Sequence, residues 1–316
     1  MSVVEKPKAD DSLNWARLRA TALESIREIE LPGDLQIPAL PQAVTEFSER
    51  ASDPNVEIKE LAAIVSTSTG LTFELLKYVN SAVFALSSPV RDVGAAIAKI
   101  GIGGARTYLI AAGMKAANSA MNSRLMNQRV AWNEGLQKAL FARAVAKTLR
   151  IDEGLSFMGG LLQDFLLLAL TNHFYGDYIR FLETDARDGR DLADWELEQF
   201  GWTHATAGAY VAHKWRFPDD LLCAIYYHHS LRDTLNNPEV ELFKLFPVTL
   251  SGLLPDQVRQ SARGIADLIA VDGRCSALKL DELCRAVDEE QMQMADGVET
   301  PESLLRIIQE ARQSMK

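Results

Sequence analysis

Apolar residues recur every three or four positions along most of this chain, and this spacing constrains its fold more than any other feature. Leu71, Leu75 and Val79, for example, follow one another at intervals of four. A period of 3.6 residues places apolar side chains on one face of a helix, whereas a half-buried strand alternates with a period of two. No alternating run long enough for a sheet is present, so the sequence predicts an all-α protein. Helices are expected near 12–30, 93–119, 123–149, 155–171, 174–186, 191–200, 203–215, 219–230, 255–271, 279–294 and 301–315.

The composition is typical of a folded globular chain without a membrane span. Hydrophobic residues make up 47% of the 316 positions and charged residues 24%, close to the average for such proteins. The uninterrupted apolar run Phe165–Leu170 is far shorter than the roughly 20 residues that a spanning helix needs. The N-terminal residues lack the apolar core of a signal peptide. We therefore expect a cytoplasmic protein that makes no membrane contact.

Charge and cysteine content exclude two further classes of protein. The net formal charge of −10 repels a phosphate backbone, so no nucleic-acid partner is expected. The three cysteines, Cys223, Cys275 and Cys284, are odd in number and have no CxxC spacing. They form neither a disulfide framework nor a zinc knuckle, and we expect reduced thiols.

The glycine-rich segment Gly101–Gly104 does not fit a nucleotide-binding loop. It lacks the GxGxxG spacing, no predicted strand precedes it, and no GK[ST] sequence follows. The interpretation that fits is a tight bend that opens a helix over 104–119.

Asp164 stands out as a carboxylate in an apolar segment. One turn away on either side lie Gly160, Leu161, Leu167 and Leu168. Burying a carboxylate is costly unless it is hydrogen-bonded, paired or bound to a metal. Two interpretations stay open, namely a carboxylate bonded to a histidine or to the backbone, and a metal ligand.

Among the five histidines, His228 and His229 end a predicted helix, where both rings can reach one point. His204 and His213 lie nine positions apart on one predicted helix, which is about 900° of rotation, so they face opposite sides. At most one of the latter two can therefore share a site with the pair.

A series of motifs in fixed order resembles the HDOD domain, the HD-related output domain of bacterial signalling proteins. The resemblance covers about residues 35–231. Its segments are IPALPQAV from Ile37, SDPN from Ser52, LAAIV from Leu61, LLKYVNSA from Leu75, SPV from Ser88, AAIAKIG from Ala95, Trp132, GGLL from Gly159, HATAG from His204, Trp215, Phe217-Pro218 and AIYYHH from Ala224.

The resemblance implies an HD-type helical bundle packed on an N-terminal helical half, with extra helices at both ends. The chain then divides into an N-terminal helical extension over 1–34, an HDOD domain over 35–236 and a C-terminal helical region over 237–316 that packs on the HDOD domain. The sequence Asn236-Asn237-Pro238 marks the second boundary.

Departures from the HD pattern bear on catalysis. In the metal-dependent HD phosphohydrolases, two metal-binding histidines stand at the positions that align with Glu134 and Gln163. A neutral amide is a poor substitute ligand, so the resemblance implies an HD fold without the standard hydrolase site and without catalytic residues. Asp164, His204, His228 and His229 align with positions that help to hold the second ion in HD-GYP relatives, and Glu134 and Gln163 complete the candidate ligand pocket. One carboxylate and three imidazoles can bind a single divalent metal; alternatively, these groups bond to one another and fix the helices.

The function implied by the resemblance is a non-catalytic signal-transduction output or scaffold protein. It would bind a signalling protein partner or a nucleotide, and it would require no cofactor, although a single divalent metal is compatible with the residues. The alternative is a metal-dependent phosphohydrolase or phosphodiesterase with a degenerate mononuclear site. One metal ion still lowers the pKa of a bound water and polarises a phosphoryl oxygen.

Overall fold

The computed structural model describes the chain from residue 15 to residue 315, apart from positions 28, 38, 82–83, 85, 87, 120–122, 237–239, 276 and 295–300. Helices connected by turns and short loops make up these residues, and no strand occurs among them. The all-α prediction is therefore confirmed.

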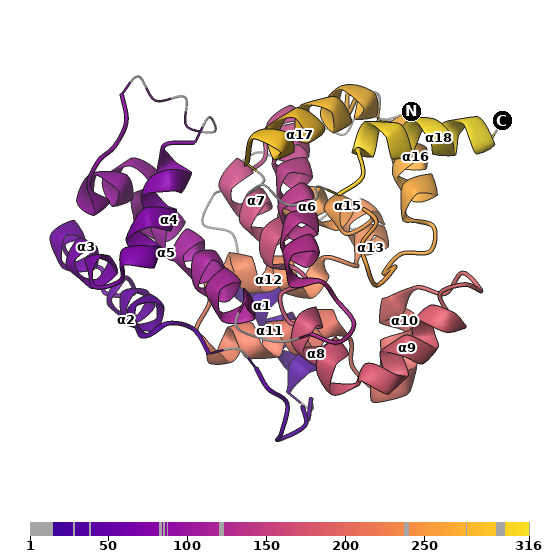
Figure 1. Ribbon diagram of the computed structural model, residues 1–316, viewed down its shortest axis with the longest axis horizontal. Helices are drawn as coiled ribbons and strands as arrows, with labels where there is room; N and C mark the ends of the chain where they lie inside the picture. The colour runs from indigo at the N-terminus through magenta and orange to yellow at the C-terminus, as the bar shows by residue number, and fades with distance from the viewer. Residues whose placement is uncertain are drawn as a thin grey trace.

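The N-terminal half is a small helical layer, on the left of Figure 1. Its apolar faces bury Phe47, Leu61, Leu75 and Ile97 completely. The last helix of the layer, α5, packs on the three before it and extends into the body of the protein, where it contacts α6 and α7. The helices are α2 (Gln42–Arg50), α3 (Ile58–Ser66), α4 (Thr69–Val79) and α5 (Val93–Ser119).

The predicted bend at the glycine-rich segment is present inside α5. Gly101 has φ 76° and ψ 162°, a backbone conformation that is open to glycine and strained for other residues. The bend separates the part of α5 that packs in the N-terminal layer from the part that reaches the central helices.

Replacing Gly101 by alanine is expected to destabilise the fold through backbone strain alone, because no heavy atom lies within 4 Å of the position of the added Cβ. We expect a loss of about 1–2 kcal/mol, measured by chemical denaturation. Gly103→Ala is the matched control, since its Cβ also meets open space but its backbone lacks a positive φ. An equal loss in both variants would contradict this account.

The central body surrounds the long helix α6. Its backbone comes unusually close to α7 at Gly160, where a Cβ would lie 2.8 Å from the carbonyl oxygen of Lys138 and 2.9 Å from the Cα of Ala139. Only glycine permits this approach, and it brings the end of α7 next to Lys138. The helices of the body are α6 (Gln128–Leu149), α7 (Glu153–Leu162), α8 (Leu167–His173), α9 (Tyr175–Glu183), α10 (Leu192–Phe200), α11 (His204–Lys214), α12 (Asp219–Tyr227), α13 (Leu231–Asn236), α14 (Val240–Lys244) and α15 (Phe246–Ser251).

The single helix predicted over 155–171 is wrong in one respect. Helix α7 ends at Leu162, and a turn over 163–166 separates it from α8. Asp164 lies in that turn. The sequence from Glu153 to His173 is apolar and long enough to cross a membrane, but 78% of its most apolar window is buried inside the protein. Its packing is that of core helices.

Helices at both ends pack on the body. Helix α1 (Trp15–Ile26) lies against α11 and α12 and buries Leu18, Ala22 and Ile26. At the other end are α16 (Gly264–Arg274), α17 (Leu280–Met294) and α18 (Leu304–Ser314), and α17 packs along α6. Asn237 and Pro238, at the predicted domain boundary, lie outside the described residues, and the three-part division stays a prediction.

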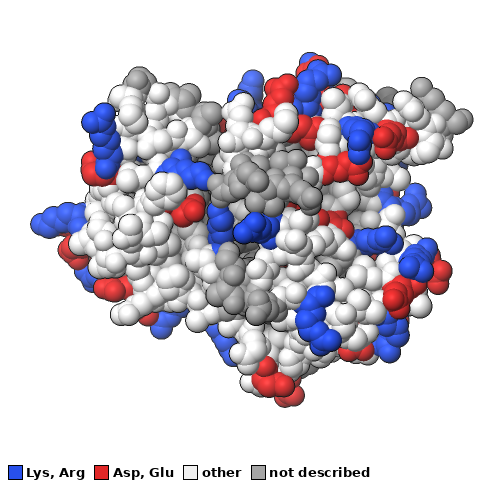
Figure 2. Space-filling model, in the orientation of Figure 1, with Lys and Arg blue, Asp and Glu red and all other residues white. Residues whose placement is uncertain are grey.

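The surface charge is mixed. On the face shown in Figure 2, basic and acidic side chains are interspersed among the described residues. Among the described residues of that face, no continuous basic patch is visible. All three cysteines are free thiols, with Cys223 and Cys284 buried.

Candidate functional site

Three imidazole rings and one carboxylate meet in the body. The Nε2 atom of His204 lies 3.2 Å from that of His228 and 2.9 Å from that of His229. The Asp164 Oδ1 atom lies 3.3 Å from His228 Nε2 and 3.5 Å from His204 Nε2. The structure thus brings together all four residues proposed as metal ligands. It also shows that His228 and His229, which follow the end of α12 directly, both reach His204.

Local sequence places these rings. Thr203 and Thr206 form a capping box that begins α11 at His204. The Nδ1 atom of His204 donates to Glu196 Oε2 at 2.6 Å, and Nδ1 of His228 donates to the Ile225 carbonyl oxygen at 2.7 Å. In both rings the neutral tautomer therefore carries its proton on Nδ1, and the lone pair of Nε2 faces the common point.

Glu196 is a buried hub behind His204. Its side chain has no exposed surface. It accepts hydrogen bonds from the Tyr178 hydroxyl at 2.6 Å, the His204 backbone N–H at 2.7 Å and the His204 ring. Carboxylates that hold the second nitrogen of a histidine in this way are common behind metal ligands, although a structural hydrogen-bond network uses the same contacts.

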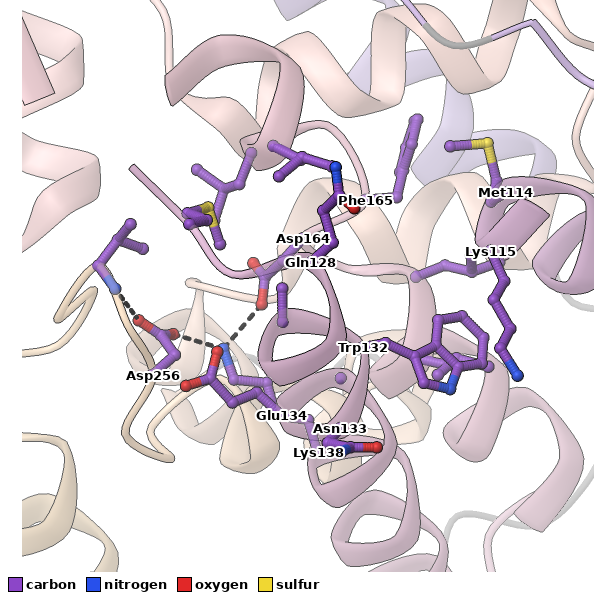
Figure 3. A pocket seen from close by; sticks show the side chains of 18 of the residues that line it. Met114, Lys115, Gln128, Trp132, Asn133, Glu134, Lys138, Asp164, Phe165 and Asp256 are labelled. Atoms are coloured by element: carbon purple, nitrogen blue, oxygen red, sulfur yellow. Dashed lines mark hydrogen bonds and ion pairs between the residues drawn. The ribbon is translucent and has the colours of Figure 1, made fainter. Parts of the chain in front are cut away.

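On its other side, the Asp164 carboxylate contacts Lys138. The Lys138 ammonium donates to Asp164 Oδ2 and to Asp256 Oδ2, both at 2.7 Å (Figure 3). The side chains of Lys138 and Asp256 are only 3% and 4% exposed, and that of Asp164 is 21% exposed. Asp256 is held in turn by the Val258 backbone N–H and by the Gln260 amide. The ammonium is thus fixed between two carboxylates.

The electrostatics of the cluster follow from burial and from these contacts. Burial disfavours charge on each group. The Lys138 ammonium, together with His204 and His228, nevertheless holds the pKa of Asp164 well below its usual range. Burial likewise opposes the imidazolium form of His204, yet Glu196 and Asp164 raise its pKa to about 10. Burial and the neighbouring rings keep the pKa of His229 well below its usual value. Without a metal, these shifts favour the imidazolium form of His204 and the neutral forms of His228 and His229.

The two remaining candidate residues lie next to this cluster but have other partners. Glu134 accepts a hydrogen bond from the Gln257 amide at 3.3 Å, and burial together with Asp256 raises its pKa to about 7. Gln163 is 1% exposed and accepts from the Ser251 hydroxyl at 3.3 Å. Neither side chain is hydrogen-bonded to the histidines in the structure.

Sequence reasoning missed Lys138, Glu196 and Asp256. Lys138 directly precedes the apolar run Ala139–Ala142, and a charge beside such a run was a usable signal of a buried ion pair. Asp256, in a loop 118 residues after Lys138, gave no such signal. Glu196 lies on an amphipathic helix among other acidic residues, where a charge is expected at the surface.

A cavity of about 600 Å³ opens beside the site. Asp164, Lys138, Glu134 and Asp256 line one end of it, and the Trp132 ring lines another part, with the Lys115 ammonium 4.9 Å from the ring centre. Figure 3 shows these side chains around the cavity. Its volume is that of a small-molecule site.

The residues present fit one divalent metal ion. Asp164 Oδ1 is buried and has no hydrogen-bond partner, and ligand atoms of His204, His228 and His229 lie within 4.8 Å of one another. Three imidazole nitrogens and one carboxylate oxygen make a four-ligand set suited to Zn²⁺ and similar ions. A bound ion would supply Lewis acidity, and the chain would hold it through α11, the end of α12 and the turn before α8.

Comparisons with other proteins agree with this architecture. An uncharacterised protein of Treponema pallidum is 28% identical over 200 residues, which are 62% of this chain but only 38% of that protein. A crystal structure from Shewanella amazonensis, described as a candidate phosphohydrolase, is similar with a TM-score of 0.60 and 20% identity over 87% of this chain and 97% of its own. One from Marinobacter aquaeolei, described as a candidate signal transduction protein, has a TM-score of 0.56 and 19% identity over 91% of this chain and 67% of its own.

These two likenesses concern the fold alone. The family model of the HDOD domain matches residues 37–231, more than half of the chain, and its bounds agree with those of the resemblance seen in the sequence. The chain therefore belongs to the HDOD family.

Proposed function

We propose that this protein is a non-catalytic output module of bacterial signalling, located in the cytoplasm, that acts by binding a small ligand or a partner protein. The observation that carries the proposal is the position of the Lys138 ammonium between Asp164 and Asp256. Hydrolysis by two metal ions needs both ions to stabilise the attacking and leaving oxygens. An ammonium between the carboxylates neutralises them, but it offers no open coordination position for a water or a phosphate.

The cavity supports a binding role. Trp132 presents an aromatic surface, and Lys115 and Arg129 bring positive charge to the lining. A ligand with a flat ring and a phosphate group, such as a nucleotide, matches both features. The signalling description of the Marinobacter aquaeolei relative agrees with such a role.

We expect the purified protein to hydrolyse neither a cyclic dinucleotide nor bis(p-nitrophenyl) phosphate, with or without added Mn²⁺ or Fe²⁺. Product formation, followed by chromatography and by absorbance, should equal that of Asp164→Ala under the same conditions. Turnover by the wild type that Asp164→Ala abolishes would contradict the proposal and would favour a phosphohydrolase with one metal ion. That alternative rests on the three histidines and Asp164 Oδ1, which can hold an ion.

A further inference from the structure

One carboxylate, that of Asp164, borders two positions suited to a cation. Its Oδ2 atom accepts from the Lys138 ammonium at 2.7 Å. Its Oδ1 atom is buried without a hydrogen-bond partner and lies within 3.5 Å of two imidazole nitrogens. Asp164 thus has one oxygen at each of two cation positions, which is how a carboxylate bridges the ions of a two-ion site. The first of these positions is filled by the Lys138 ammonium.

The first position has ligands that suit a divalent ion. Lys138 Nζ lies 2.7 Å from Asp256 Oδ2 as well as from Asp164 Oδ2, and Figure 3 shows the Glu134 carboxylate beside them. The Gln260 amide, which donates to Asp256 Oδ2, leaves its own oxygen buried and unpartnered. Several carboxylate oxygens around one point are the ligands preferred by Mn²⁺ and Mg²⁺. The ammonium therefore occupies a place that otherwise fits a small divalent ion.

The second position needs a cation as well. Hydrogen bonds to Glu196 and to the Ile225 carbonyl turn the Nε2 atoms of His204 and His228 toward each other at 3.2 Å, so that without a metal a proton on His204 Nε2 has to lie between them. His229 Nε2 lies 2.9 Å from His204 Nε2. Lone pairs at these separations repel one another unless a cation lies between them. A metal ion satisfies all three nitrogens and Asp164 Oδ1 together, whereas a proton serves one pair at a time.

We propose that Lys138 is a built-in cation that replaces one metal ion of a two-cation site. The wild-type chain then binds a single divalent ion through Asp164 Oδ1 and the Nε2 atoms of His204, His228 and His229. Removing the Lys138 side chain opens a second ion position between Asp164 Oδ2 and Asp256. This inference rests on the role given to Lys138 in the proposed function, and it adds the number of ions and what sets that number.

The test is the metal content of the full chain. Wild type, Lys138→Ala and Lys59→Ala are stripped with chelator and titrated with Co²⁺ and with Mn²⁺, and bound metal is counted by mass spectrometry after gel filtration. We expect one ion per chain in the wild type, two in Lys138→Ala, and one in the control Lys59→Ala, whose lysine is 80% exposed. Co²⁺ bound to three nitrogens and one oxygen in the wild type should give the intense visible absorption of tetrahedral cobalt. His228→Gln should lose that absorption.

Zero or two ions in the wild type, or one ion in Lys138→Ala, would overturn the inference. If Lys138→Ala does not fold, crystals of the wild type soaked in Mn²⁺ decide. One anomalous peak among the histidines supports the inference, while a peak between Asp164 and Asp256, or no peak, overturns it. Turnover by a wild type that binds one ion would refute the non-catalytic function and leave this inference standing. An inactive wild type that binds no ion would refute this inference and leave the non-catalytic function standing.

Discussion

Lys138→Met is expected to destabilise the metal-free protein by about 3–5 kcal/mol at neutral pH, because it leaves the buried Asp256 carboxylate without its ion-pair partner and removes the ammonium from Asp164. The side chains are similar in length, so the loss reports mainly the charge and its hydrogen bonds. Thermal and urea unfolding in the presence of chelator measure the effect. The control Lys59→Met replaces a lysine whose side chain is 80% exposed, and it should change stability by less than about 0.5 kcal/mol.

The loss in Lys138→Met should shrink as the pH falls. In the wild type the pKa of Asp164 is held well below its model-peptide value of 3.8 despite burial, mainly by Lys138. The stabilisation from that depressed pKa is present above the unfolded-state pKa and is lost as the pH falls through the folded-state pKa. In the variant the Asp164 carboxylate, without the ammonium, takes up a proton more readily. A difference between wild type and variant that does not shrink as the pH falls below about 4 would contradict the assignment of an ion pair.

Glu196→Ala is expected to have an effect of similar size, about 4 kcal/mol, since it removes three hydrogen bonds from a fully buried carboxylate and leaves the His204 ring unsupported. Tyr178→Phe removes one of the three and should cost about 1–2 kcal/mol. Denaturant unfolding of both variants provides the comparison. Glu198→Ala is the control, because Glu198 lies on the same helix with a side chain 74% exposed. If Glu196→Ala lost no more stability than this control, the three hydrogen bonds of Glu196 would not stabilise the fold.

Much of the fold could be predicted from helical periodicity, because the spacing of apolar residues in an amphipathic helix shows which face is buried. The helix over 93–119 and the bend at its glycines are examples. The break at 163–166 was not predictable in this way. Both α7 and α8 are buried around most of their circumference, so the apolar pattern runs through the turn and does not show it.

The candidate site could be predicted from the sequence only in part. Asp164 stands out because a polar group in apolar surroundings needs a partner. The resemblance to the HDOD domain then grouped Asp164 with His204, His228 and His229 as one candidate site. The partner that changes the chemistry, Lys138, lies 26 residues before Asp164 and 118 before Asp256. Its importance depends on the contact at Gly160 that brings α6 and α7 together, and such a contact between backbones leaves no periodic signal in the sequence.

The packing of α1 on α11 and α12 has a consequence for biosynthesis. The contacts join residues about 200 positions apart, as in the ion pair between Arg19 and Asp219. A ribosome that adds 5–20 residues per second needs roughly 10–40 s to supply the partner helices after α1 has been made. During that interval Leu18, Ala22 and Ile26, which are buried in the finished fold, have no native surface to cover them. The nascent chain is therefore open to chaperone capture and to misassembly at α1 until α12 has emerged.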